Sequence, residues 1–214
     1  MSRSNLGRFL RLIAAEVPAQ VFNPWTQRDT LQDLCADAAA QRLARLKAHL
    51  AAQPARILLG EASGYQGCHV SGIPFTSERL LLADAVPRVS VPAARLSQRH
   101  IPWSEPSATT VWGALHELGA AADTLLWNAY PWHPHKPGNL QSNRTPTPSE
   151  RAAGLPVLEA LLAVFPQVQL FAVGKQAQSA LEELGLACTP LRHPSMGGAM
   201  QFRAGLKAAL RRRG

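Results

Sequence analysis

Three residues of this sequence could carry chemistry, and each lies at or just past the end of a short apolar run: Glu61, Asn128 and His193. A carboxylate can position water, an amide can donate and accept on one edge, and an imidazole can donate to a developing anion. Phe75 lies shortly after the first run and offers an aromatic face. Together these groups suit a flat heterocycle with hydrogen-bonding edges.

The elements that must position these residues are predicted strands and helices in alternation. The apolar runs read as strands at 55–60, 123–132, 168–174 and 187–195. The first three runs are continuous, as expected for strands covered on both faces. Helical patterns occupy 77–86, 108–119, 148–165, 175–185 and the C-terminal stretch from 199. This order predicts a three-layer α/β/α sandwich around a central four-stranded parallel sheet.

In open parallel sheets, ligands bind beyond the carboxyl ends of the strands. A glycine-rich loop with Gly60, Gly64 and Gly67 follows the first predicted strand. We expect these glycines to let backbone N–H groups approach a ligand without intervening side chains.

The whole chain, residues 1–214, is predicted as a single domain. Residues 1–54 are predicted as a helical extension that packs on the rest of it. Ser149 is the predicted N-cap residue of the helix at 148–165, and Gly185 is predicted to end the helix at 175–185. The stretch 130–150 is too rich in proline for a helix or a central strand.

The charge balance favours a polyanionic partner. The chain has 22 basic residues, 18 of them arginine, against 14 acidic ones, for a net charge of +8. Nucleic acid is the commonest partner of a soluble protein with a strong positive charge. The alternative is that the many arginines reflect codon bias alone.

The three cysteines are far apart, which argues against a disulfide scaffold, a structural zinc site and an iron–sulfur cluster. His133 and His135 lack a third ligand nearby and read as loop residues, so we expect no metal and no cofactor. The start of the chain is a poor signal peptide and no run is long enough to span a membrane. These features predict a cytoplasmic monomer.

Four motifs at the predicted strand ends resemble the uracil-DNA glycosylase superfamily, in the same order and over roughly residues 55–205. They read GEASGYQG with SGIPFTS, Asn128 in LLWNAYPW, NRTPTPSE, and HPS in RHPSMGG. The resemblance implies hydrolysis of the N-glycosidic bond of a uracil that is flipped out of DNA, which leaves an abasic site.

The resemblance also implies roles in the base pocket. His193 would donate to the uracil O2, Asn128 would read O4 and N3–H, and Phe75 would stack on the base. Residues Gly60, Ala62 and Gly64 would line the pocket.

DNA contacts are implied at the rim of the pocket. Ser63 and Ser195 would each hold a flanking phosphate, and Met196 would fill the space left by the flipped base. Arg144 has either a structural role or a phosphate contact.

Ala62 stands where the most active relatives have an aspartate that positions the attacking water. Glu61 is our first choice for that task, with His69 and Asn143 as the others. The loss of the aspartate also leaves open a reader that binds uracil or abasic DNA with weak turnover. Gly64 leaves open a changed base range that includes hypoxanthine or xanthine.

Overall fold

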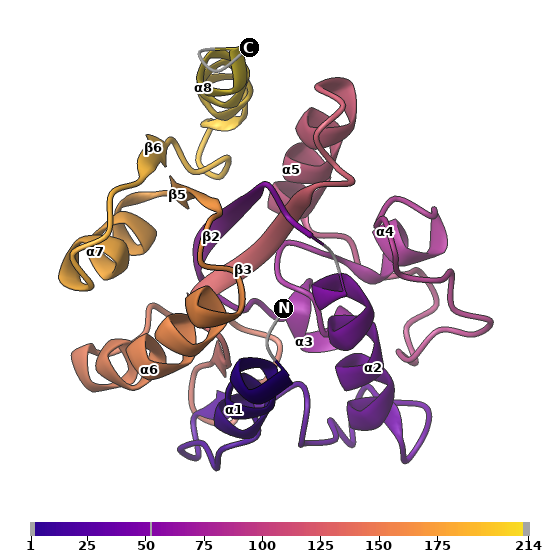
Figure 1. Cartoon of the computed structure of the whole chain (residues 1–214). Helices are drawn as coiled ribbons and strands as arrows, with labels where there is room; N and C mark the ends of the chain where they lie inside the picture. The colour runs from indigo at the N-terminus through magenta and orange to yellow at the C-terminus, as the bar shows by residue number, and fades with distance from the viewer. Residues whose placement is uncertain (1–2, 52, 212–214) are drawn as a thin grey trace.

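A four-stranded parallel sheet forms the centre of the computed structural model, which describes residues 3–51 and 53–211 (Figure 1). Its strands lie in the order β3-β2-β5-β6, and each neighbouring pair is parallel. Their bounds are β2 Arg56–Ala62, β3 Thr124–Tyr130, β5 Gln169–Val173 and β6 Thr189–Leu191. The predicted sheet is confirmed, and β2 runs two residues further than expected, so that Glu61 belongs to the strand.

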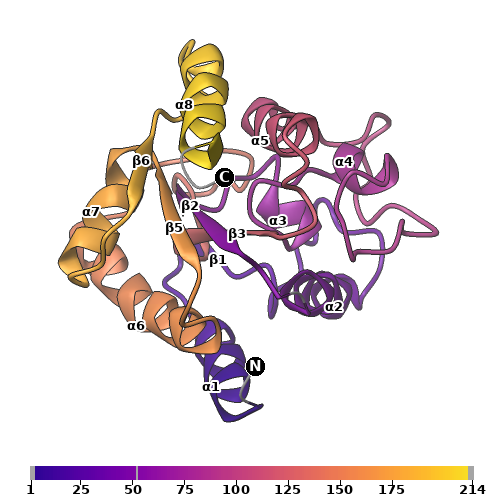
Figure 2. The ribbon, with the colours of Figure 1, turned by 45° about the horizontal axis from the view of Figure 1, so that its top comes forward.

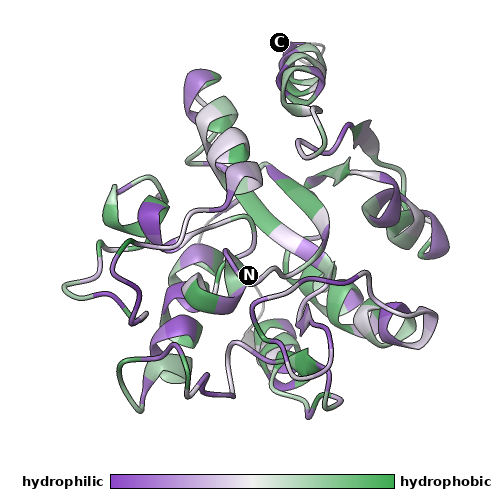
Figure 3. Cartoon of the chain, turned by 180° about the vertical axis from the view of Figure 1, so that it is seen from behind, coloured by the Kyte–Doolittle hydropathy of each residue, from purple (hydrophilic) through white to green (hydrophobic). Residues whose placement is uncertain are grey.

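Side chains alternate along each strand between two separate hydrophobic cores. On β2, Ile57 and Leu59 enter one core and Leu58 enters the other. Figure 2 shows the two helical layers on either side of the sheet, and the central strands are largely apolar in Figure 3. One layer contains α1 (Arg3–Ile13), α6 (Pro148–Val164) and α7 (Lys175–Glu183), and the other contains α4 (Glu78–Leu82), α5 (Pro106–Glu117) and α8 (Ala199–Arg211). The predicted three-layer sandwich is therefore present.

The prediction that the first 54 residues are helical is wrong in part. Helix α2 spans Ala38–Leu50, but the stretch between α1 and α2 holds turns and the short strand β1 (Val21–Phe22). Strand β1 pairs antiparallel with β4 (His133–Pro134). The Asp29 carboxylate accepts the Leu31 N–H, and the Asp33 carboxylate accepts the Asp29 N–H. These side-chain bonds to the backbone compete with helix formation at 29–33.

Helix α6 begins at Pro148 as expected, but its capping residue lies two positions earlier than predicted. Thr147, not Ser149, is its N-cap, and Thr147 and Glu150 form a reciprocal capping box with Pro148 between them. Gly185 follows α7 with a φ of 69°, as predicted for a helix end. None of the described helices is long and apolar enough to cross a membrane.

Candidate active site

A cavity of about 400 Å³ opens at the carboxyl ends of β2 and β3. It brings together nine of the predicted site residues: Glu61, Ala62, Ser63, Gly64, Phe75, Asn128, Arg144, His193 and Ser195. Five more residues line it: Cys68, Glu105, Ser107, Asn143 and Thr145. Of these five, sequence reasoning had singled out only Asn143.

Two of the three loop glycines make room for side chains of the protein itself. A Cβ on Gly60 would lie 2.5 Å from the Phe75 ring and 2.6 Å from the Asn128 carboxamide. A Cβ on Gly64 would meet the Asn143 amide at 3.4 Å, and one on Gly67 would collide with the Glu105 carboxyl. Gly60 and Gly67 therefore admit a side chain at the wall of the cavity, whereas a Cβ on Gly64 would only touch Asn143, and the expectation that backbone N–H groups approach a ligand at these glycines stays a prediction.

Asn128 is buried at the level of Gly60, its partner across the sheet. We assign its amide so that Oδ1 accepts from the Ser63 N–H at 3.2 Å and Nδ2 donates to the Trp127 carbonyl at 3.2 Å. An amide has two N–H groups and two oxygen lone pairs. One donor and one acceptor thus remain for a ligand in the cavity.

Phe75 is buried, and its backbone has a φ of 49°. This conformation is rare for a bulky residue and stores strain of a kind that clusters at functional sites. Its ring covers the end of β2 at Gly60 and lies 6.3 Å from the His193 ring, centroid to centroid. The Phe75 ring therefore forms an aromatic wall of the cavity near both Asn128 and His193.

The backbone around His193 fixes the tautomer of the ring. The Ser195 N–H donates to His193 Nδ1 at 3.1 Å, so this nitrogen carries no proton. Burial, helped by the charge of Arg192, lowers the pKa of His193. The ring is accordingly neutral near pH 7, and its Nε2–H is a hydrogen-bond donor.

Glu61 stands between two cavities. It lines the main one and also a small one of about 30 Å³ behind it, together with Arg151. Burial raises the pKa of Glu61 while the charge of Arg151 opposes the rise, and its buried Oε1 has no hydrogen-bond partner among the described residues. A carboxylate in this state is able to hold a water molecule.

Comparison with known proteins decides the family. A family model described as the Uracil DNA glycosylase superfamily matches residues 48–211. The chain belongs to this superfamily. The crystal structure of SMUG2 from Pedobacter heparinus shares the fold, with a TM-score of 0.67, 14% identity and coverage of 97% of each chain. No curated protein sequence matches the chain.

Membership of the uracil-DNA glycosylase superfamily supports a DNA glycosylase that acts on DNA. The geometry corrects the predicted DNA contact of Ser63 and bears on the two alternatives for Arg144. The Ser63 hydroxyl is buried and donates to the Pro131 carbonyl, so it does not face a phosphate. Arg144 donates both terminal nitrogens to the Glu150 carboxylate at 2.7 Å and its Nε to the His135 carbonyl at 3.0 Å. Its contacts favour the structural alternative.

Ser195 and Met196 lie at the protein surface, and Ser195 lines the cavity. Both are exposed, Met196 by 91%, and they follow His193 directly. Met196 has a φ of 51°, which directs the chain sharply at this point. The predictions for these two residues stay predictions.

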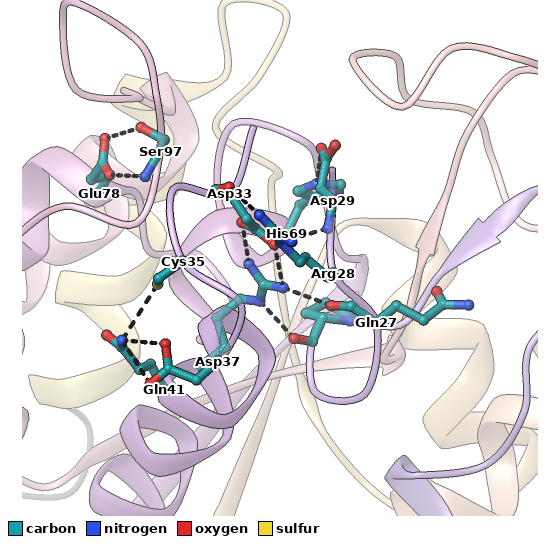
Figure 4. Close-up of polar contacts among 12 residues, drawn as sticks. Gln27, Arg28, Asp29, Asp33, Cys35, Asp37, Gln41, His69, Glu78 and Ser97 are labelled. Carbon is teal, nitrogen blue, oxygen red and sulfur yellow. Dashed lines mark hydrogen bonds and ion pairs between the residues drawn. The ribbon is translucent and has the colours of Figure 1, made fainter. Parts of the chain in front are cut away.

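His69 lies behind the cavity rather than in it. Its Nε2 is 2.9 Å from Asp29 (Figure 4). The neighbouring Asp33 forms a two-point ion pair with Arg42. His69 is buried and does not line the cavity. As a candidate partner of the attacking water it is therefore excluded, and Glu61 and Asn143 remain.

Glu105 is the site residue that sequence reasoning missed. It precedes Pro106 at the start of α5, where an acidic residue reads as an ordinary helix beginning. No local signal shows that the Gly64–Gly67 loop folds against it, since the two are far apart in the sequence. Among the described residues, no group of three or more His, Cys, Asp or Glu side chains could hold a metal ion.

Proposed function

We propose that the protein is a monofunctional uracil-DNA glycosylase that works as a cytoplasmic monomer without cofactor. The free donor and acceptor of Asn128 carry this proposal. Uracil presents a carbonyl at C4 beside the N3–H, which is the complement of that pair. Cytosine presents an amino group beside an unprotonated N3 and reverses both demands.

In the proposed reaction, the base is flipped out of the stack and lies on Phe75. The bond between C1′ and N1 breaks, and its electron pair leaves with the uracil. The neutral His193 donates its Nε2–H to the anion that grows on O2. A water oxygen bonds to C1′, its proton passes to solvent or to the base, and the products are free uracil and an abasic site.

The test uses a labelled oligonucleotide with one uracil, either single-stranded or opposite G or A. Alkali after incubation cuts the abasic sites. We expect cleavage by the wild type, and a rate lower by about a hundredfold or more in Asn128→Ala and in His193→Asn, because the first loses its amide and the shorter side chain of the second no longer aims a donor at O2. His100→Asn, on an exposed loop residue, is the matched control and should keep the wild-type rate.

A second outcome would contradict the proposal. If the wild type binds uracil-containing or abasic DNA tightly but releases no base, the protein is a reader. Ala62, which presents a methyl group to the cavity, is the observation that favours this alternative.

A further inference from the structure

Glu105 brings a carboxyl group to the active-site cavity that no described residue satisfies. Its buried Oε2 has no hydrogen-bond partner. The residue occupies the N-cap position of α5, with φ −108° and ψ 116°, yet its side chain does not cap the helix. The carboxyl instead lies on Gly67, which has no Cβ to obstruct it.

An unpaired buried carboxyl is costly, and proteins rarely keep one. Glu105 could bond to its own helix, because the N–H groups of Ser107 and Ala108 in the first turn of α5 have no partner within the helix, but its side chain makes no such bond. The side chain turns instead to Gly67, at the wall of the cavity. An orphaned polar group in a pocket is best explained by a partner that arrives with the ligand.

The surroundings of Glu105 favour its protonated form. Burial raises its pKa to about 7. The other titratable or charged groups of the cavity are Glu61, Cys68, Arg144 and His193. The positive charge of Arg144 is paired with Glu150, and the ring of His193 is neutral, so neither residue offers Glu105 a free positive charge. Burial raises the pKa of Cys68 to about 12, so its thiol is neutral as well. On the outer side, Arg79 donates to Ser104 and Thr109.

We propose that the Glu105 carboxyl reads the flipped base by donating a hydrogen bond to one of its carbonyl oxygens. The substrate class is then the deaminated bases, in which a carbonyl replaces an amino group. This inference rests on the proposed glycosylase function. An ionised Glu105 would lose the donor and would repel the anion that leaves C1′, so turnover requires the proton on Glu105.

The test is the pH dependence of kcat/KM for a uracil oligonucleotide, from about pH 5.5 to about pH 9. For the wild type we expect a fall of about tenfold per pH unit above the pKa of Glu105. Glu105→Gln keeps a neutral donor of the same shape, so its rate should stay within about threefold of the low-pH wild-type rate and show no such fall. Glu105→Ala should be slower by about tenfold or more at low pH. Glu159→Gln, on an exposed turn of α6, is the matched control.

A binding measurement separates base reading from a structural role. The probes are one oligonucleotide with a non-cleavable 2′-fluorinated deoxyuridine and one with an abasic analogue. Glu105→Ala should weaken binding to the first by about tenfold and leave binding to the second unchanged. Equal losses on both probes, or a Glu105→Gln profile that still falls as in the wild type, would overturn the inference. If the wild type releases no base, the glycosylase proposal fails, and the ratio of the two affinities still tests Glu105.

Discussion

His69 and His133 meet inside the protein through their Nδ1 atoms, which are 2.9 Å apart. His133 Nε2 lies 2.8 Å from the Ser142 carbonyl, which can only accept, so this nitrogen carries a hydrogen. Burial lowers the pKa of His133 to about 3, so the ring is neutral and its Nδ1 accepts from His69. The Nε2 of His69 lies 2.9 Å from the Asp29 carboxylate. Burial lowers the pKa of His69, although the hydrogen bond and the charge of Asp29 oppose this shift.

This chain of contacts joins the N-terminal segment to the cavity wall. Ser142 precedes Asn143, whose Oδ1 accepts the Tyr65 N–H of the glycine-rich loop at 3.0 Å. The loop geometry around Asn143 therefore depends on residues far from the cavity.

Removing the buried carboxylate partner of His69 should cost stability. In Asp29→Asn the His69 ring and the Leu31 N–H lose their carboxylate acceptor inside the protein, and we expect a loss of about 1–3 kcal/mol in the free energy of unfolding. Urea denaturation measures it. Asp37→Asn is the matched control, because Asp37 is exposed and bonds only to nearby groups such as Gln41, and it should cost at most about 1 kcal/mol. Equal effects of the two substitutions would refute the buried pair.

The same pair predicts the response to acid. Burial would raise the pKa of Asp29, but the hydrogen bond and charge of His69 hold it below its ordinary value of 3.8. Because the pKa of Asp29 is lower in the folded state, its carboxylate contributes stability at any pH above the ordinary pKa of 3.8. This contribution is lost as the pH falls from 3.8 through the lower pKa of the folded state. Asp29→Asn should lack this part of the acid transition.

Gly60→Ala should remove activity by blocking the place that Phe75 and Asn128 share. The new Cβ would lie within 2.6 Å of both side chains, so one of them must shift. We expect a rate loss of about a hundredfold or more, with a stability loss of about 1–3 kcal/mol. Gly7→Ala in α1 is the control, since its Cβ meets only Arg11 at 3.6 Å and a helix gains up to about 1 kcal/mol from the change. Near-normal turnover of Gly60→Ala would show that the Phe75 ring is not needed where it lies.

Glu61→Gln tests the partner of the attacking water. The amide keeps the shape of Glu61 but loses the negative charge, so turnover should slow by about tenfold or more while DNA binding survives. Single-turnover rates and a shift assay with uracil DNA measure the two effects. An unchanged rate would pass the role to Asn143, which lines the same cavity. Glu159→Gln again serves as the exposed control.

Sequence patterns were sufficient for the sheet, the order of its elements along the chain and the edge of the sheet where the cavity opens. Continuous apolar runs separated by helical patterns leave few topologies, and parallel strands bring their carboxyl ends to one edge. Asn128 and His193 were predictable because a strand end fixes their place. The changed base range was argued from an open space at Gly64, and the structure places the Asn143 amide against that glycine.

Only the tertiary structure decided what faces the three glycines, and that the carboxyl of Glu105 lies unpaired in the cavity. A glycine in a sequence reports that something comes close, but the identity of the neighbour depends on loops that fold back over 15 to 79 positions. The turns at 29–33 were likewise hidden in the predicted helical extension. Asp29 and Asp33 bond to the backbone there, and they also bond to His69 and Arg42 from other elements. Local pattern fixes which segments become strands and helices, whereas burial and long-range contacts fix which polar groups are left for a ligand.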